Sequence, residues 1–151
     1  MKLFSFLFIC LSILACNTRQ NDKKNTEENV PETKENSGTQ CYLYTSAFDT
    51  ILLNITQTNE NVTGTLLYKL KEKDSNTGTI QGTIKDSIIL ADYTFMSEGI
   101  NSVRQVAFKI EDDNLLEGYG EVMNDNDKTK FKNPDSLIFS SSLKIAKTTC
   151  P

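Results

Sequence analysis

Arg104 is the residue of this chain whose position most favours ligand chemistry. It is in phase with Val106, Phe108 and Ile110, which predicts a guanidinium at the end of an apolar strand face. If that charge is buried, it needs a carboxylate partner, because an unpaired buried ion is costly. Two interpretations stay open: an anion or carboxylate clamp at the mouth of a barrel, or a strand-end arginine whose head lies in water. The candidate carboxylates are Asp92, Glu98 and Glu117.

Three aromatic residues accompany Arg104 in the alternating runs: Tyr93, Phe95 and Phe108. They predict either the lining of a ligand pocket or an ordinary hydrophobic core. The chain has no histidine, so it lacks the commonest general base and metal ligand. Its acidic turns lack the glycine and terminal glutamate of a calcium loop. We therefore expect no catalytic residue, no metal site and no cofactor, and the chain is not predicted to be an enzyme.

Apolar residues alternate with polar ones from Cys41 onward, in short runs separated by turn residues. The pattern predicts an all-β fold of seven to nine antiparallel strands joined in sequence. Closing such a meander into a barrel of about eight strands would remove its unpaired edges; the alternative is a two-layer β-sandwich. In the run after Asp113, the residues expected to face inward are Leu116, Gly118, Gly120 and Val122.

The N-terminus has the layout of a secretory signal, with Lys2 followed by an uncharged apolar run, Leu3 to Ala15. Its end, Ile13-Leu14-Ala15-Cys16, resembles a bacterial lipobox, which implies cleavage before Cys16 and lipidation of that cysteine. The alternative is a secreted protein with a fortuitous cysteine. Because no acidic residue follows directly, we expect an outer-membrane anchor that faces the periplasm.

Loss of the signal, residues 1–15, removes one of sixteen basic residues and leaves fifteen against twenty acids, a net charge of minus five. That balance disfavours nucleic acid and an anionic membrane face as partners. Residues 16–40 are predicted to be the lipidated cysteine and a disordered tether, because Val30 is the only aliphatic residue between Asn17 and Gln40. Residues 41–151 are predicted to be the barrel domain.

Two cysteines remain once Cys10 is removed with the signal and Cys16 is lipidated. In an oxidising compartment, Cys41 and Cys150 are predicted to form a disulfide that brackets the folded region. Two free thiols are the alternative.

Three tripeptides resemble the acceptor pattern for periplasmic O-glycosylation in one bacterial group: Asp49–Ile51, Asp86–Ile88 and Asp135–Leu137. The acceptor residues would be Thr50, Ser87 and Ser136. The alternative is structural, since Asp-Ser and Asp-Thr pairs also open strands after turns.

The segments Ala91–Gly99, Ser102–Arg104 and Glu117–Glu121 resemble the motif set of a family of small uncharacterised membrane lipoproteins common in Bacteroidota. The terminal cysteine pair fits that family as well. At the level of fold, the pattern is similar to calycin-like barrels, although the chain lacks the tryptophan of the lipocalin signature. The resemblance implies an envelope location and brings no activity or site residues.

These observations predict a membrane-anchored, non-enzymatic binding module for a small apolar or amphipathic ligand. The alternative is a structural or interaction protein of the envelope, with a filled core and a protein partner in place of a ligand.

Overall fold

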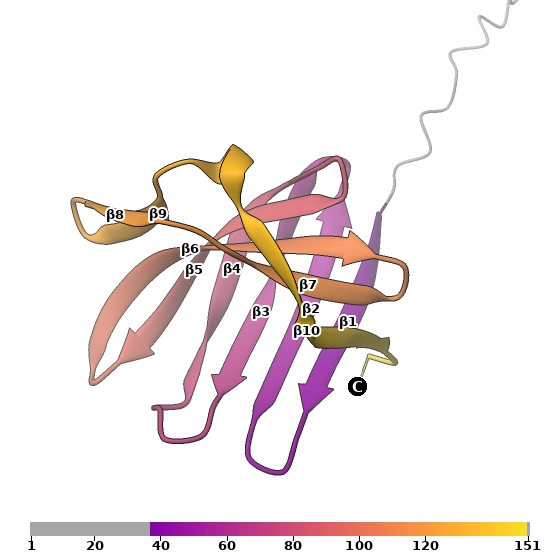
Figure 1. Ribbon diagram of the computed structural model, residues 1–151, viewed down its shortest axis with the longest axis horizontal. Coiled ribbons are helices and arrows are strands. Elements are labelled where there is room, and N and C mark those ends of the chain that lie inside the picture. The colour runs from indigo at the N-terminus through magenta and orange to yellow at the C-terminus, as the bar shows by residue number, and fades with distance from the viewer. Residues whose placement is uncertain (1–36, 151) are drawn as a thin grey trace, which may run out of the picture. The chain divides into compact units, whose positions relative to one another are not determined.

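Ten β-strands and one 3₁₀ helix make up residues 37–150, the part of the chain that the computed structural model describes (Figure 1). No helix in this range has the length and apolarity needed to cross a membrane. The elements are β1 (Ser37–Thr45), β2 (Thr50–Thr58), β3 (Asn61–Lys69), β4 (Asn76–Lys85), β5 (Ile88–Ser97), β6 (Ile100–Glu111), β7 (Asn114–Tyr119), β8 (Val122–Asp125), β9 (Lys128–Phe131), η1 (Pro134–Ser136) and β10 (Ile138–Thr148).

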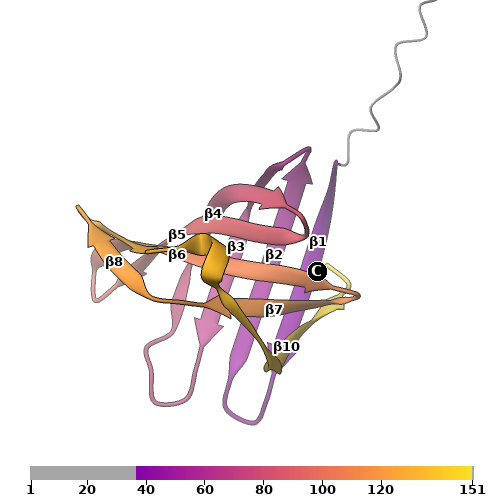
Figure 2. The same ribbon diagram turned by 45° about the horizontal axis from the view of Figure 1, so that its top comes forward.

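Eight of these strands close into an antiparallel barrel, in the order β5-β4-β3-β2-β1-β10-β7-β6, with β6 paired back to β5. The predicted eight-stranded barrel is confirmed, and the sandwich is excluded. Strands β8 and β9 form an added hairpin on the outside of this ring (Figure 2). The hairpin joins the barrel through a short parallel pairing of β9 with β6, at Val103–Lys128 and Arg104–Thr129.

Hydrophobic side chains from the inward positions of the strands fill the barrel. Tyr93 and Phe108 are both 0% exposed, so these two predicted ligand residues belong to the core. Burial of such side chains stabilises the fold by about 25 cal/mol per Å² of apolar surface. The core cluster comprises Tyr42, Ile51, Leu53, Ile55, Val62, Leu66, Tyr68, Ile80, Ile89, Ala91, Tyr93, Val106, Phe108, Leu115 and Ile145.

Two glycines allow neighbouring strands to approach closely on the inner face of the wall. A Cβ atom at Gly64 would lie 1.9 Å from the carbonyl oxygen of Asn54, and one at Gly82 would lie 2.1 Å from that of Leu90. Both contacts involve backbone, which a side chain cannot push aside. Glycine at these positions therefore lets the sheet coil tightly enough to close.

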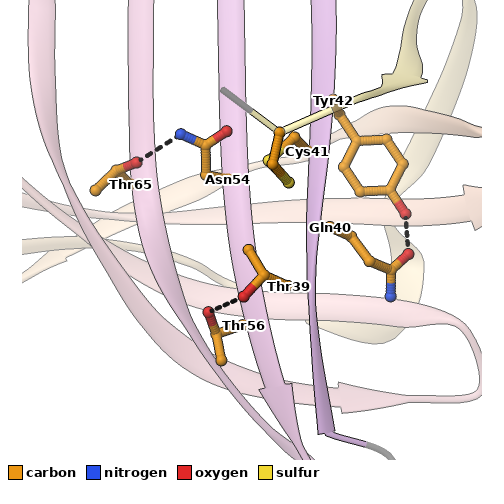
Figure 3. Close-up of a disulfide and its surroundings, with 8 residues drawn as sticks. Thr39, Gln40, Cys41, Tyr42, Asn54, Thr56 and Thr65 are labelled. Atoms are coloured by element: carbon orange, nitrogen blue, oxygen red, sulfur yellow. Dashed lines mark hydrogen bonds between the residues drawn. A yellow bond between two sulfur atoms is a disulfide. The ribbon is translucent and has the colours of Figure 1, made fainter.

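The barrel closes between its first and last strands, and the Cys41–Cys150 disulfide reinforces that seam (Figure 3). The two strands share the pairs Cys41–Thr148, Tyr42–Lys147 and Leu43–Ala146. The cysteine Cα atoms are 5.2 Å apart across a sequence separation of 109. The predicted disulfide is thus present, and a loop of this length predicts a stabilisation of up to about 4.7 kcal/mol in the chain-entropy model.

Strand β1 begins at Ser37, whereas the composition places the start of the domain at Cys41. All nine residues of β1 pair with β2, from Ser37–Thr58 to Thr45–Thr50. Side chains add to this pairing, since the Thr39 and Thr56 hydroxyls lie 3.2 Å apart. Composition marks a strand by its apolar residues, so it did not identify the polar residues 37–40, which belong to β1 through backbone pairing.

The prediction of inward-facing residues in β7 is wrong by one position. Leu115 belongs to the barrel core, whereas Leu116 and Gly118 face outward. A Cβ atom at Gly118 would lie 2.8 Å from the ring of Phe139 in β10, so this outer face is covered as well. Because both faces of β7 are buried, alternation could not identify which one points inward.

Candidate functional site

The two ends of the barrel present different side chains. One end, which we call the mouth, carries the β1–β2, β3–β4 and β5–β6 connections; the first two lie side by side at the bottom of Figure 1. The other end, which we call the acidic end, carries the tight turns at Asn59–Glu60, Asp86–Ser87 and Asp112–Asp113. Arg104 lies about halfway along the pairing of β5 with β6, opposite Tyr93 and four residues beyond Ile100 on the mouth side.

The wall of the barrel is notched on the mouth side between β6 and β7. The last pair that these strands share is Phe108–Glu117, and at Val103 and Arg104 the neighbour of β6 is β9 instead. A groove of about 300 Å³ occupies this notch. Its lining includes Arg104, Glu117, Tyr119, Val122, Thr129 and Phe131.

Aromatic rings surround the Arg104 guanidinium. Its Cζ atom lies 5.0 Å from the ring centroid of Tyr68, 5.6 Å from that of Tyr93 and 5.7 Å from that of Phe95. The Tyr93 and Phe95 rings stack with their centroids 4.7 Å apart. Each ring face attracts a cation, so the three together hold the guanidinium without an acidic partner.

No carboxylate within residues 37–150 forms an ion pair with Arg104. Its Nε atom is buried and has no hydrogen-bond partner in the described part of the chain. Asp92, one predicted partner, instead accepts from Lys128 Nζ at 2.6 Å. Glu98, another, lies in the β5–β6 turn with a φ of 50°. An arginine in this state retains donors for an external anion.

Glu117, the third predicted partner, is held by two tyrosines. Tyr68 donates its hydroxyl to Glu117 Oε1 at 2.6 Å, and Tyr119 donates to Oε2 at 2.9 Å. Burial, followed by the negative charge of Glu117, raises the pKa of Tyr68 well above its usual value. The same causes raise the pKa of Tyr119. Both tyrosines therefore remain neutral donors at physiological pH, and the carboxylate is fixed beside the groove.

Two hydrogen bonds hold the Tyr93 ring in place beneath the Arg104 guanidinium. The Tyr93 hydroxyl donates to the carbonyl oxygens of Leu66 at 3.1 Å and Asn76 at 2.9 Å. Burial raises the pKa of Tyr93 to about 12. The ring under Arg104 is thus anchored to strands β3 and β4 and cannot turn away.

This arrangement can bind an anion or an amphipathic molecule. A guanidinium offers a planar fork of donors that matches a carboxylate or a phosphate. Tyr119, Val122 and Phe131 in the groove lining offer apolar surface. No group of three or more His, Cys, Asp or Glu residues that could hold a metal occurs in the described range.

The structure packs Arg104 against Tyr93 and Phe95, and both Tyr93 and Phe108 belong to the barrel core. Sequence reasoning missed Tyr68, Glu117 and Tyr119 as a unit. Tyr68 and Glu117 are 49 residues apart, and alternation alone does not reveal that they meet.

The other predicted sites fall in different places. Cys16 lies outside the described residues, so its lipidation stays a prediction. Ser87 is exposed in the β4–β5 turn, and Thr50 is half-buried at the start of β2. Ser136 is exposed in η1, where its hydroxyl donates to the Asn133 carbonyl at 3.1 Å.

No protein-family model, curated protein or solved structure matches this chain. Fold and site therefore define its class: a small closed β-barrel of eight strands, with an arginine held over aromatic rings in a notch of its wall.

Proposed function

We propose that this protein is a membrane-anchored lipoprotein of the cell envelope that binds a small amphipathic ligand with an anionic head. The head would bind to Arg104, and the apolar part would lie along the groove between β6, β7 and β9. The protein acts without catalysis.

One observation carries this proposal: the Arg104 guanidinium is held over three aromatic rings, with a buried Nε atom that has no partner. A half-buried cation without an acceptor is costly for the fold. An anionic ligand would offset that cost, and bidentate hydrogen bonds to it would add affinity.

The filled interior supports a ligand site in the notch, in place of one deep inside the barrel. Eight-stranded barrels have an interior that side chains just fill or that holds one small ligand. Here the largest inward side chains, among them Tyr42, Tyr93 and Phe108, are less than 2% exposed. The groove at Arg104 opens through the wall instead.

Calorimetric titration of the full chain with single-chain amphiphiles below their micelle concentration tests the site. An alkyl phosphate should bind, whereas an alkyl alcohol and an alkyl trimethylammonium of equal length should not. Arg104→Gln should weaken phosphate binding by roughly tenfold to a hundredfold, the equivalent of losing hydrogen bonds to a charged group.

Lys109→Gln is the matched control, because it removes one positive charge from the same strand at an exposed position. Its affinity should equal that of the native chain. Equal binding of all three amphiphiles, or native affinity in Arg104→Gln, would contradict the proposal.

The envelope anchor is tested separately by Cys16→Ser and membrane fractionation. Native protein should sediment with the membranes and the variant should remain in solution. A variant that still sediments would overturn the lipid anchor. Intact-mass measurement of native material tests glycosylation at Thr50, Ser87 and Ser136, since each sugar adds a discrete increment.

The filled core also supports the second candidate, an interaction protein of the envelope without a ligand. Native mass spectrometry of protein extracted from its own cells separates the two. A co-purified small molecule supports the binding module, whereas bare protein that also fails to bind alkyl phosphate supports the interaction protein.

A further inference from the structure

We infer that the mouth of the barrel docks onto the surface of a phospholipid bilayer, with Arg104 bound to a lipid phosphate. The head-group contact rests on the proposed anion site, whereas the docking itself rests on a different set of side chains.

Exposed apolar side chains gather at the mouth. Within the described residues, the large hydrophobics that face solvent belong to the mouth or to the adjoining strand β8, and none lies on the turns of the acidic end. Six of them are between 50% and 75% exposed, of which Val122 lies in β8. We call the other five the apolar rim: Phe48, Met96, Ile100, Tyr119 and Ile138.

The rim comes from separate segments of the chain. Phe48 lies in the β1–β2 turn, Met96 and Ile100 flank the β5–β6 turn, and Tyr119 pairs with Ile138 where β7 ends and β10 begins. Apolar residues at the tips of separate turns suit a fluid apolar phase, which adapts to any arrangement of side chains. Burial of each such side chain in the acyl boundary should strengthen binding by about tenfold or more.

A lysine beside the rim has the geometry of a residue at a membrane interface. Lys71 Nζ lies 4.9 Å from the ring centroid of Phe48, and the Lys71 backbone N–H donates to Asp49 at 2.7 Å. An aromatic ring can enter the acyl boundary while the adjacent ammonium remains among the head groups. These contacts join the β1–β2 and β3–β4 connections into one surface.

Charge does not distinguish the two ends, because acids stand on the connections of both: Glu60, Asp86, Asp112 and Asp113 at the acidic end, and Asp49, Glu72, Asp74 and Glu98 at the mouth. Within the described residues the apolar rim lies only at the mouth, and it selects the end that faces the lipid. Burial of the rim requires no net positive charge, so the docking fits the negative balance of the chain and does not depend on anionic lipids. A zwitterionic phospholipid supplies the phosphate for Arg104.

The anchor would permit this orientation. Strand β1 begins at the acidic end, and its nine residues span about 30 Å. The twenty residues between Cys16 and Ser37 reach at most about 70 Å when extended. A chain of that length can pass along the barrel and still allow the mouth to meet the bilayer that holds the lipid.

The absence of tryptophan from the chain provides a direct test. Ile100→Trp places a single fluorophore on the rim, and Glu60→Trp places one on the acidic end as the matched control. The full chain is mixed with phosphatidylcholine vesicles, with and without brominated acyl chains. Bromine should quench the rim fluorophore by more than half and leave the control unchanged. Equal quenching at both positions, or none at the rim, overturns the docking.

Two further variants separate the rim from the head-group site. Met96→Ser in the Ile100→Trp background should weaken vesicle binding about tenfold, in line with the loss of one buried apolar side chain. Arg104→Gln should weaken vesicle binding by a similar factor. The native chain should bind vesicles of a galactolipid, which has no phosphate, as weakly as Arg104→Gln binds phosphatidylcholine vesicles.

The outcomes distinguish this inference from the proposed function. Alkyl phosphate binding without rim quenching leaves the anion site standing and overturns the docking. If the rim fluorophore is quenched equally in the native chain and in Arg104→Gln, the rim inserts but the head-group contact is overturned. Absence of quenching together with a stable complex with an envelope protein assigns the rim to a protein partner and overturns the inference.

Discussion

The mouth and the acidic end of this barrel are built from the same strands and differ in how well their groups are satisfied. At the acidic end, short polar turns connect the strands, and nearly all of the larger side chains exposed there are hydrophilic. At the mouth, the Arg104 guanidinium has no acceptor among residues 37–150, Glu117 is held by two tyrosines, and apolar side chains face solvent. The acidic end therefore stabilises the fold, whereas the mouth holds a cation without an acceptor in this range and exposed apolar side chains whose energetic cost a ligand or a surface can offset.

The disulfide should give the largest effect, because it closes the seam between the first and last strands. Replacing Cys41 and Cys150 by alanine should lower the free energy of unfolding by up to about 4.7 kcal/mol, as expected for a loop of this length. Chemical denaturation of the native and double-variant chains measures the difference.

The site at the mouth should keep its alkyl phosphate affinity in this double variant under native conditions, since Arg104 and its rings lie on β3, β5 and β6. Loss of affinity in a variant that is still folded would show that the two regions are coupled.

Tyr93→Phe should come second, because Tyr93 is the buried anchor of the mouth. Its hydroxyl donates to two carbonyl oxygens, and losing those bonds should cost about 1–3 kcal/mol of unfolding free energy. Urea denaturation measures this loss. Tyr44→Phe, at a half-buried position where no hydroxyl bond forms, is the matched control and should change stability little.

Tyr93 also predicts the direction of the alkaline response. Burial raises its pKa from 10.0 to about 12, so the folded state holds the proton more tightly than the unfolded state. The resulting stability is fully present below pH 10 and is lost as the pH rises through about 12. Tyrosinate absorbance and denaturation followed together across that range check this, and Tyr93→Phe should show a shallower loss.

Arg104→Met should separate stability from binding at the mouth. Removing a cation without an acceptor relieves a desolvation cost, while the thioether keeps contact with the rings, so unfolding free energy should be unchanged or rise by about 1 kcal/mol. Alkyl phosphate binding should disappear. A clear loss of stability would show that ring contacts alone satisfy the guanidinium.

Lys128→Ala should give the smallest effect. It breaks the 2.6 Å ion pair with Asp92 that ties the β8–β9 hairpin to the barrel, a pair whose side chains are 32% and 40% exposed. Such pairs contribute up to about 1 kcal/mol. Lys130→Ala, which breaks the pair with Asp125 inside the hairpin, is the control. Thermal unfolding should barely distinguish the variants, whereas proteolysis should cut the hairpin faster in Lys128→Ala.

Local pattern was enough to predict most of the architecture. Alternation around Ile51, Val62 and Ile89 identified strands, because period two is a property of neighbouring residues. The cysteine count and the oxidising compartment predicted the Cys41–Cys150 disulfide. Arg104, Tyr93 and Phe95 were each identified as candidates, but their contact was not predicted.

The inward face of β7 could not be read from the sequence, because Phe139 covers the outer face and buried residues therefore occur on both faces of the strand. Tertiary structure also placed Glu117 against Tyr68, so that Glu117 forms no ion pair with Arg104. It placed β9 beside β6 where β7 ends, which opens the notch. These features depend on register and on closure of the ring, which join residues far apart in the chain. Local sequence was enough for the strands and for the Cys41–Cys150 disulfide, whereas the groove and its side chains depend on the pairing of strands that are distant in the chain.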